Sequence, residues 1–128
     1  MKAKWGLIVL FLHMAIGAAG AQTAAEQDAA NYPNRPIHII VPFPAGGPSD
    51  VLARIIGQKL SEDWKQSVIV ENRVGANTVI GAQAVAAAPG DGYTLLMAID
   101  STLTMNQFLY KSLPYDPLRD FVPITVVA

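Results

Sequence analysis

The stretch Val41–Asp50, VPFPAGGPSD, decides the fold, because it joins two apolar patterns of different period. Before it, residues 37–41 are apolar and mostly β-branched, which is typical of a strand buried on both faces in a parallel sheet. After it, apolar residues recur with helical spacing from Val51 onward. Pro48 suits the first position of a helix, where its missing N–H would have no partner in any case. The stretch therefore predicts a strand-to-helix turn with Gly47 as the helix N-cap.

This turn is also a candidate binding site for a small anion. The N–H groups of Gly47, Ser49 and Asp50 are expected to point out of the helix end, where the helix dipole favours negative charge. Because Gly46 and Gly47 lack Cβ atoms, a ligand can approach the backbone closely. A plain Gly/Pro turn with nothing bound explains this stretch alone equally well.

The first residues have the pattern of a secretory signal peptide. Two lysines give a basic start, a mostly apolar run reaches Ala19, and Ala19-Gly20-Ala21 fits a small-x-small cleavage site. The apolar run is shorter than the ~20 residues that a transmembrane helix needs. We therefore expect residues 1–21 to be cleaved and residues 22–34 to form a mobile mature N-terminus and lead-in. A periplasmic location follows, with no direct membrane insertion after cleavage.

Composition excludes several classes of protein. The chain has 128 residues, enough for one modest domain. Its formal charge of −1 becomes −3 when the leader leaves with its two lysines, which does not indicate nucleic-acid binding. The absence of cysteine excludes disulfides, thiol catalysis and thiolate metal sites. This usage fits a bacterial envelope protein better than a small disulfide-stapled secreted domain.

Strand-like and helix-like patterns alternate after the opening turn. The expected elements are a helix over 48–64, a strand over 67–71, a helix over about 78–88, a strand over 93–98, a short helical segment over about 103–110 and a fourth strand over 121–127. Alternation of this kind predicts an α/β fold with a parallel βαβαβ core and right-handed connections.

This topology brings three turns, residues 42–50, 72–78 and 99–102, to one edge of the sheet. Open α/β sheets bind their ligands beyond the carboxyl ends of the strands, which is this edge. All three turns carry Gly, Ser, Thr or Asn, which suit hydrogen bonding to a small polar ligand. Three convergent polar turns favour a binding site more strongly than the first turn alone.

Several motifs occur in the order found in one known family. They are YPNRPI at 32–37, VPFPAGGPSD at 41–50, VIVENR at 68–73, IGA at 80–82, DGYTL at 91–95 and LPYDP at 113–117. Together they extend over nearly all of residues 32–128. In these motifs the chain resembles the N-terminal portion of the Bug family, the periplasmic receptors of tripartite tricarboxylate transporters.

The resemblance implies a type II, flytrap-like periplasmic binding protein with two lobes. Such receptors capture small carboxylates or related metabolites and present them to the membrane permease subunits of the transporter. Because members of the family are considerably longer, residues 35–128 are expected to form an incomplete first lobe, from a fragment or a truncated product. A single lobe excludes less water from a ligand, so weaker binding is expected of it.

The resemblance also implies which residues bind the ligand. The first turn grips a carboxylate, partly through ordered water, and the third turn adds hydroxyl groups. The second turn is less rich in glycine here than is usual in the family. The implied ligand-binding residues are Phe43, Pro44, Ala45, Gly46, Gly47, Ser49, Asp50, Asn77, Thr78, Ser101 and Thr102.

Other interpretations of these residues stay open. The Asp50 carboxylate would repel an anion at the same helix end, so we expect it to cap or orient the turn. Arg73 has two roles open to it, contact with an anion or pairing with an acid such as Glu71. An enzyme is the rival class, but His38, the only histidine of the mature chain, lies within a strand, away from Ser49 and its turn. No cofactor or metal is expected. A ligand-binding input to an envelope sensor and a non-functional remnant are alternative functions.

Overall fold

The computed structural model describes residues 30–127, so the expected signal peptide lies outside the described residues. The chain divides into two units, residues 1–34 and 35–128. The described residues of the second unit contain three strands and four helical segments. They are β1 (Ile37–Val41), α2 (Pro48–Trp64), β2 (Val68–Asn72), α3 (Val79–Ala86), β3 (Thr94–Leu96), η1 (Ser101–Met105) and α4 (Asn106–Leu109). No helix in this described part is long and apolar enough to cross a membrane.

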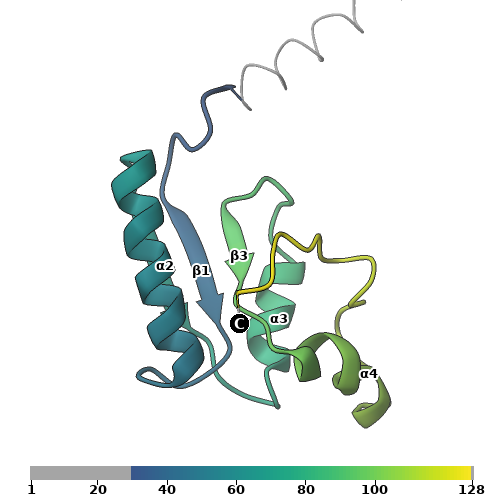
Figure 1. Cartoon of the computed structure of the whole chain (residues 1–128). Helices are drawn as coiled ribbons and strands as arrows, with labels where there is room; N and C mark the ends of the chain where they lie inside the picture. Colours follow the sequence, from purple (N-terminus) through teal and green to yellow (C-terminus); the bar gives the residue numbers. More distant parts are fainter. Residues whose placement is uncertain (1–29, 128) are drawn as a thin grey trace, which may run out of the picture. The chain divides into compact units, whose positions relative to one another are not determined.

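The three strands form one parallel sheet in the order β2-β1-β3, and Figure 1 shows β1 beside β3. Ile39, in the central strand, lies opposite Val70 of β2 and Leu95 of β3. Helix α2 connects β1 to β2 on one side of it, and α3 then connects β2 to β3 on the other side. Because the two connections run in opposite directions across the sheet and both are right-handed, α2 and α3 lie on opposite faces. The predicted α/β fold with a parallel βαβαβ core is therefore confirmed.

Two hydrophobic clusters fill the two faces. Ile39 and Val41 pack with Ala53 of α2 on one face. On the other face Val79 and Ala82 of α3 pack with Tyr115, which follows α4 in the chain. Successive residues of a strand point to opposite faces, so Ile40 of β1 points away from the cluster with α2, and it is also buried. The central strand is thus buried on both sides, as its apolar sequence predicts.

Helix α2 packs on the sheet through small residues rather than through its largest ones. The sequence pattern predicts a contact stripe of Leu52, Ile56 and Leu60, but the fully buried apolar positions are Ala53 and Gly57. A Cβ added at Gly57 would lie 3.3 Å from Val68 Cγ1 and 3.5 Å from Val70 Cγ2. Small residues let the helix axis approach the sheet, so the larger side chains flank the contact and stay partly exposed.

The C-terminal part differs from the prediction. Residues 121–127 have no regular secondary structure and pair with no strand, so the prediction of a fourth strand there is wrong for this structure. An extended segment becomes a strand only where a neighbour satisfies its backbone N–H and C=O groups. The side chains of Val122, Ile124 and Val126 are 87%, 75% and 87% exposed.

The helical segment after β3 also begins earlier than predicted. It opens at Ser101 with η1, a π-helical turn, and passes into α4, which ends at Leu109. The Asp100 side chain starts this segment by accepting a hydrogen bond of 2.7 Å from the N–H of Ser101. A side chain cap of this kind fixes the beginning of the turn.

Candidate functional site

The three polar turns lie together at the carboxyl edge of the sheet, as expected from a parallel topology (Figure 1). Backbone hydrogen bonds continue the sheet into two of them. The N–H of Arg73 donates to Val41 O at 2.9 Å, and the N–H of Met97 donates to Ile40 O at 2.9 Å. The start of each turn is therefore held at a fixed distance from β1.

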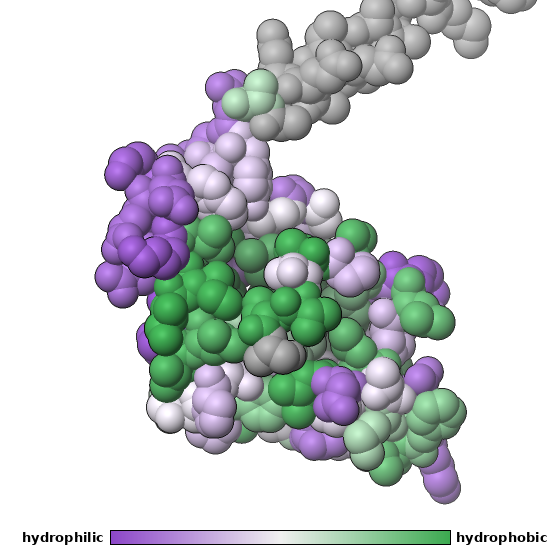
Figure 2. Space-filling model, viewed as in Figure 1, coloured by the Kyte–Doolittle hydropathy of each residue, from purple (hydrophilic) through white to green (hydrophobic). Residues whose placement is uncertain are grey.

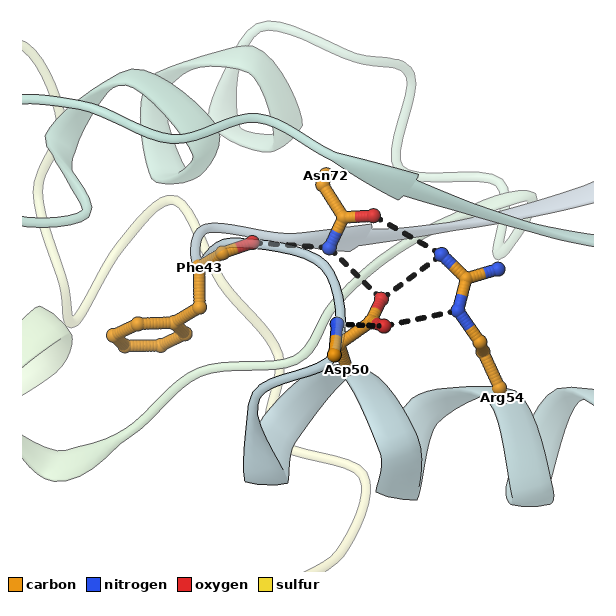
Figure 3. Close-up of polar contacts among 5 residues, drawn as sticks. Phe43, Asp50, Arg54 and Asn72 are labelled. Carbon is orange, nitrogen blue, oxygen red and sulfur yellow. Dashed lines mark hydrogen bonds and ion pairs between the residues drawn. The ribbon is translucent and has the colours of Figure 1, made fainter.

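Asp50 is the centre of the first turn (Figure 3). Its side chain is buried, and its Oδ2 accepts hydrogen bonds from the N–H of Gly46 at 2.8 Å and from Arg54 Nε at 3.0 Å. Its Oδ1 accepts a hydrogen bond from Asn72 Nδ2 at 2.8 Å and lies 3.0 Å from Arg54 Nη2. The expectation that this carboxylate orients the turn is confirmed, because it ties the glycine loop to the helix that follows it.

Asn72, the last residue of β2, connects this turn to the neighbouring strand (Figure 3). Its Nδ2 also donates to Phe43 O at 3.0 Å, and its Oδ1 accepts from Arg54 Nη2 at 3.1 Å. One amide side chain therefore contacts the backbone, the acid and the base of the first turn. Sequence patterns alone do not predict this role, although a polar residue at the carboxyl end of a strand is the signal that points to it.

These contacts fix the charge at the helix end. Hydrogen bonds from Arg54, the Gly46 N–H and Asn72 hold the pKa of the Asp50 carboxyl well below its usual range. The same pairing raises the pKa of Arg54. Asp50 is therefore ionised at neutral pH and its charge is balanced by Arg54. A paired carboxylate repels an incoming anion much less than an isolated one would.

Of the backbone amides of Gly46, Gly47, Ser49 and Asp50, the first two are used by the protein itself. The N–H of Gly46 donates to Asp50, and the N–H of Gly47 donates to Pro44 O at 3.3 Å. The expectation that the Gly47 amide points to a ligand is therefore corrected. For Ser49 and Asp50, the hydrogen bonds of the described residues include no acceptor for either N–H. These two amides stand in the first turn of α2, where the dipole is positive.

The two glycines of this turn have different roles. Gly46 has φ of +83°, a left-handed conformation that L side chains rarely adopt. Gly47 has φ of −75° and ψ of 167°, which any residue can adopt, and a Cβ there would meet only Pro44 O, at 3.4 Å. Gly46 is therefore required by the backbone, whereas the backbone at position 47 also accepts residues with a side chain.

The second turn holds three consecutive non-glycine residues in the left-handed region. Ala76, Asn77 and Thr78 have φ of 45°, 50° and 75°, after Gly75 at 140°. Each L residue in this region costs about 1–2 kcal/mol. The hydroxyl of Tyr110 donates to Ala76 O at 2.9 Å, which is one of the contacts that holds this backbone in place.

The side chains of the second and third turns meet in the interior. Thr78 Oγ1 donates to Thr102 Oγ1 at 2.9 Å, and both residues are buried. Asn106, also buried, exchanges hydrogen bonds with Asn77. Direct contact of either threonine hydroxyl with a ligand stays a prediction that this packing does not favour. The role of Asn106 is not predicted from the sequence, because its partner lies 29 residues away in the chain.

Of the remaining predicted residues, those of the first turn line its outer surface. Phe43 and Ser49 are half-buried, Pro44 and Ala45 are exposed, and Ser101 is half-buried at the start of η1. Ser49 is therefore the predicted hydroxyl group of the first turn, and it lies beside the first backbone amides of α2.

Arg73, the other candidate anion contact, pairs with an acid. Its Nη2 lies 2.9 Å from Glu71 Oε2, and Glu71 Oε1 lies 2.5 Å from His38 Nδ1. Hydrogen bonds from Arg73, which has the larger effect, and from His38 lower the pKa of Glu71. Of the two roles open to Arg73, the structure shows pairing with Glu71.

Neither of the two main surface hollows is lined by a predicted ligand-binding residue. The larger, about 550 Å³, lies beside Tyr110, Leu113 and neighbouring residues up to 120, and the other, about 430 Å³, lies between α2 and β2. Within residues 30–127, no group of three or more His, Asp or Glu side chains is arranged to hold a metal ion.

Known proteins share this sequence and fold. Protein BugT of Bordetella pertussis is 46% identical over 110 residues, which cover 85% of this chain and 34% of BugT. The solved structure of periplasmic binding protein BugD matches with a TM-score of 0.67 and 40% identity, over 73% of this chain and 31% of BugD. The structure of Rpa4515 of R. palustris with adipate matches with a TM-score of 0.65 and 39% identity, over 68% of this chain and 29% of Rpa4515.

The chain spans about a third of the length of the curated relatives it matches. Its fold is that of part of a periplasmic binding protein, as the sequence predicts. The matching family is one of transport receptors rather than enzymes. The profile of that family, described as the tripartite tricarboxylate transporter family receptor, matches residues 52–128. This chain therefore belongs to the receptor family of tripartite tricarboxylate transporters.

Proposed function

We propose that the carboxyl edge of this sheet forms one wall of a binding site for a small dicarboxylate. The observation that carries the proposal is the start of α2, where the N–H groups of Ser49 and Asp50 have no acceptor among the described residues and the Asp50 side chain ties the glycine loop to the helix. A carboxylate accepts hydrogen bonds from such amides and is stabilised by the positive end of the helix dipole. The adipate named with the Rpa4515 structure supports a ligand of this class.

The network around Asp50 prepares the site for a negative charge. Arg54 balances the Asp50 carboxylate, so the helix end carries no net side chain charge from this pair. Gly46 gives the loop its left-handed bend, and Asn72 anchors the loop to β2. A site that is rigid before binding loses less conformational entropy when the ligand arrives. The turn is thus suited to bind and release a metabolite without reacting with it.

The proposal extends to the place and the partners of the protein. The receptor works in the periplasm, after cleavage of residues 1–21, and delivers its ligand to the permease subunits of a tripartite transporter. Residues 35–128 serve as an incomplete first lobe, and the other wall of the site belongs to a second lobe of the kind that the longer relatives can supply. Binding by the present chain is consequently weak, because one side of the ligand stays in water.

An amide-detected NMR titration with adipate tests this proposal on the 128-residue chain. We expect saturable shifts of the Ser49 and Asp50 amide signals, because these N–H groups donate to the ligand. The control is the variant Gly47→Val, which fits the backbone but fills the space in front of α2. It should keep the secondary structure and lose the shifts. Shifts confined to the residues beside the larger hollow, or equal shifts with glucose, would contradict the proposal.

A further inference from the structure

The backbone of the second turn is not explained by its own sequence. Three residues with side chains, Ala76, Asn77 and Thr78, follow one another in the left-handed region, and Thr78 is β-branched. β-Branched residues are genuine outliers there. Such a conformation persists only where the surrounding structure determines it. The contacts around this turn should therefore include one that selects its conformation.

Asn106 makes a two-point contact with the middle residue of that turn. Its Oδ1 accepts a hydrogen bond of 2.8 Å from Asn77 Nδ2, and its Nδ2 donates to Asn77 O at 2.9 Å. Asn106 is completely buried. One bond holds the Asn77 side chain and the other holds its backbone carbonyl, so a single amide fixes the two groups relative to each other.

The same side chain reaches the third turn. Asn106 Nδ2 lies 3.3 Å from Thr78 Oγ1 and 3.3 Å from the Tyr115 hydroxyl, which donates to Thr102 O at 2.6 Å. Among the described residues, no buried polar side chain atom lacks a hydrogen bond. The network is complete, so removal of its central amide leaves buried partners unsatisfied.

The π-helical turn η1 explains how Asn106 comes to this position. The N–H of Asn106 donates to Ser101 O, five residues earlier, which is the hydrogen bond of a π-helix. Compared with an α-helix, this wider turn adds one residue between the start of the segment and Asn106. π-Helical turns are rare and occur frequently at functional sites.

We propose that Asn106 is a positioning residue, which selects the left-handed conformation of residues 76–78 and joins the second and third turns into one rigid wall of the ligand site. It touches no ligand and acts through Asn77 and Thr78. The inference rests on the proposed function for its effect on binding, but its effect on the turn can be measured without any ligand.

The experiment uses the 128-residue chain and the variant Asn106→Ala. The first readout is the intraresidue HN–Hα NOE of residues 76–78, which is strong only where φ is positive. We expect it to weaken in the variant. The second readout is the NMR titration with adipate. If the left-handed form falls to about a tenth of the population, the apparent affinity falls about tenfold.

Rescue by glycine separates positioning from general damage. Ala76→Gly in the Asn106→Ala background should restore the strong NOEs at Asn77 and recover most of the lost affinity, because glycine adopts positive φ readily. The matched control is Ala87→Gly, since Ala87 is also an exposed alanine next to α3 but has φ of −85°. It should restore neither readout.

Two results would overturn the inference. One is an unchanged NOE pattern at residues 76–78 in Asn106→Ala, whatever adipate does. The other is equal recovery from Ala76→Gly and Ala87→Gly. If Asn106→Ala does not fold, the same NOEs are measured at pH 7 in Asn106→Asp. This variant keeps the acceptor for Asn77 Nδ2 but loses the donor to Asn77 O, so the NOEs of residues 76–78 should weaken, and unchanged NOEs would overturn the inference. If the native chain shows the strong NOEs at residues 76–78 but no signal shifts with adipate, that result counts against the proposed function and not against the role of Asn106.

Discussion

Asp50 shows how a buried acid can serve a site for anions. The residue is 2% exposed, yet its oxygens accept from one backbone amide and two side chains, so its charge is fully engaged. Breaking a buried pair by removing one partner leaves an uncompensated charge, which is strongly destabilising. Asp50, Arg54 and Asn72 should therefore behave as one unit in mutational tests.

Substitution of Asp50 should have a pH-dependent effect on stability. The folded-state pKa of this group lies below its ordinary value of 3.8, so its contribution is complete above that value and declines as the pH falls below it. We expect Asp50→Asn to lower the melting temperature at pH 7 and the difference from the native chain to narrow between pH 4 and pH 2. Thermal melts across this range, with Asp63→Asn as a surface control, measure it. A gap that widens in acid would contradict the assignment.

The two glycines of the first turn should respond differently to alanine. Gly46 has φ of +83°, so Gly46→Ala should lower the free energy of unfolding by about 1 kcal/mol. Gly47 has an ordinary φ, so Gly47→Ala should change it by less than about 0.5 kcal/mol. Urea denaturation of both variants gives the comparison. Equal losses would show that the left-handed bend is not what the turn requires.

At the level of elements, the contact between α2 and the sheet depends on Gly57. Its missing side chain lets Val68 and Val70 approach the helix. We expect Gly57→Leu to lower the free energy of unfolding by about 1–3 kcal/mol, because the helix must move away from β2. The neighbouring change Gln58→Leu, on the exposed face, should cost less than about 0.5 kcal/mol. Urea denaturation with far-ultraviolet circular dichroism distinguishes the two. A Gly57→Leu variant as stable as the native chain would show that the close approach is not needed.

The elements that sequence predicts well are those with local signals. Helix α2 has the predicted bounds, and the three strands agree within about two residues, because β-branched runs and Gly/Pro boundaries act over short distances. The strand over 121–127 does not form, because pairing depends on a neighbour that local sequence does not describe. The same limit applies to the site. Gly46 and Asp50 stand in one recognisable turn, whereas Asn106 acts on Asn77 across 29 residues.

At the level of the whole molecule, much apolar surface is uncovered. Figure 2 shows apolar residues gathered on the visible face around α2 and the C-terminal segment. Val51 and Ile55 of α2 are 48% and 56% exposed, and Leu118 is 92% exposed. Contact with another polypeptide is one of the roles that such exposed apolar patches have. This agrees with the proposal that residues 35–128 form an incomplete lobe.

Joining the chain to the remaining two-thirds of BugT should cover this surface and complete the site. We expect the chimera to bind adipate at least about tenfold more tightly than the chain alone, because a second wall removes the ligand from water. It should also bind less of a hydrophobic fluorescent dye. Calorimetry and dye fluorescence measure the two effects. A chimera that folds but binds adipate no better than the chain alone would remove the second lobe from the proposal.

The most direct measurement of the central claim is a crystal structure of this chimera with adipate. The proposal predicts one carboxylate of the ligand within hydrogen-bond distance of the Ser49 and Asp50 backbone nitrogens, with the Asp50–Arg54 pair intact behind them. A carboxylate held by other groups, with these two amides facing protein atoms or solvent, would contradict it.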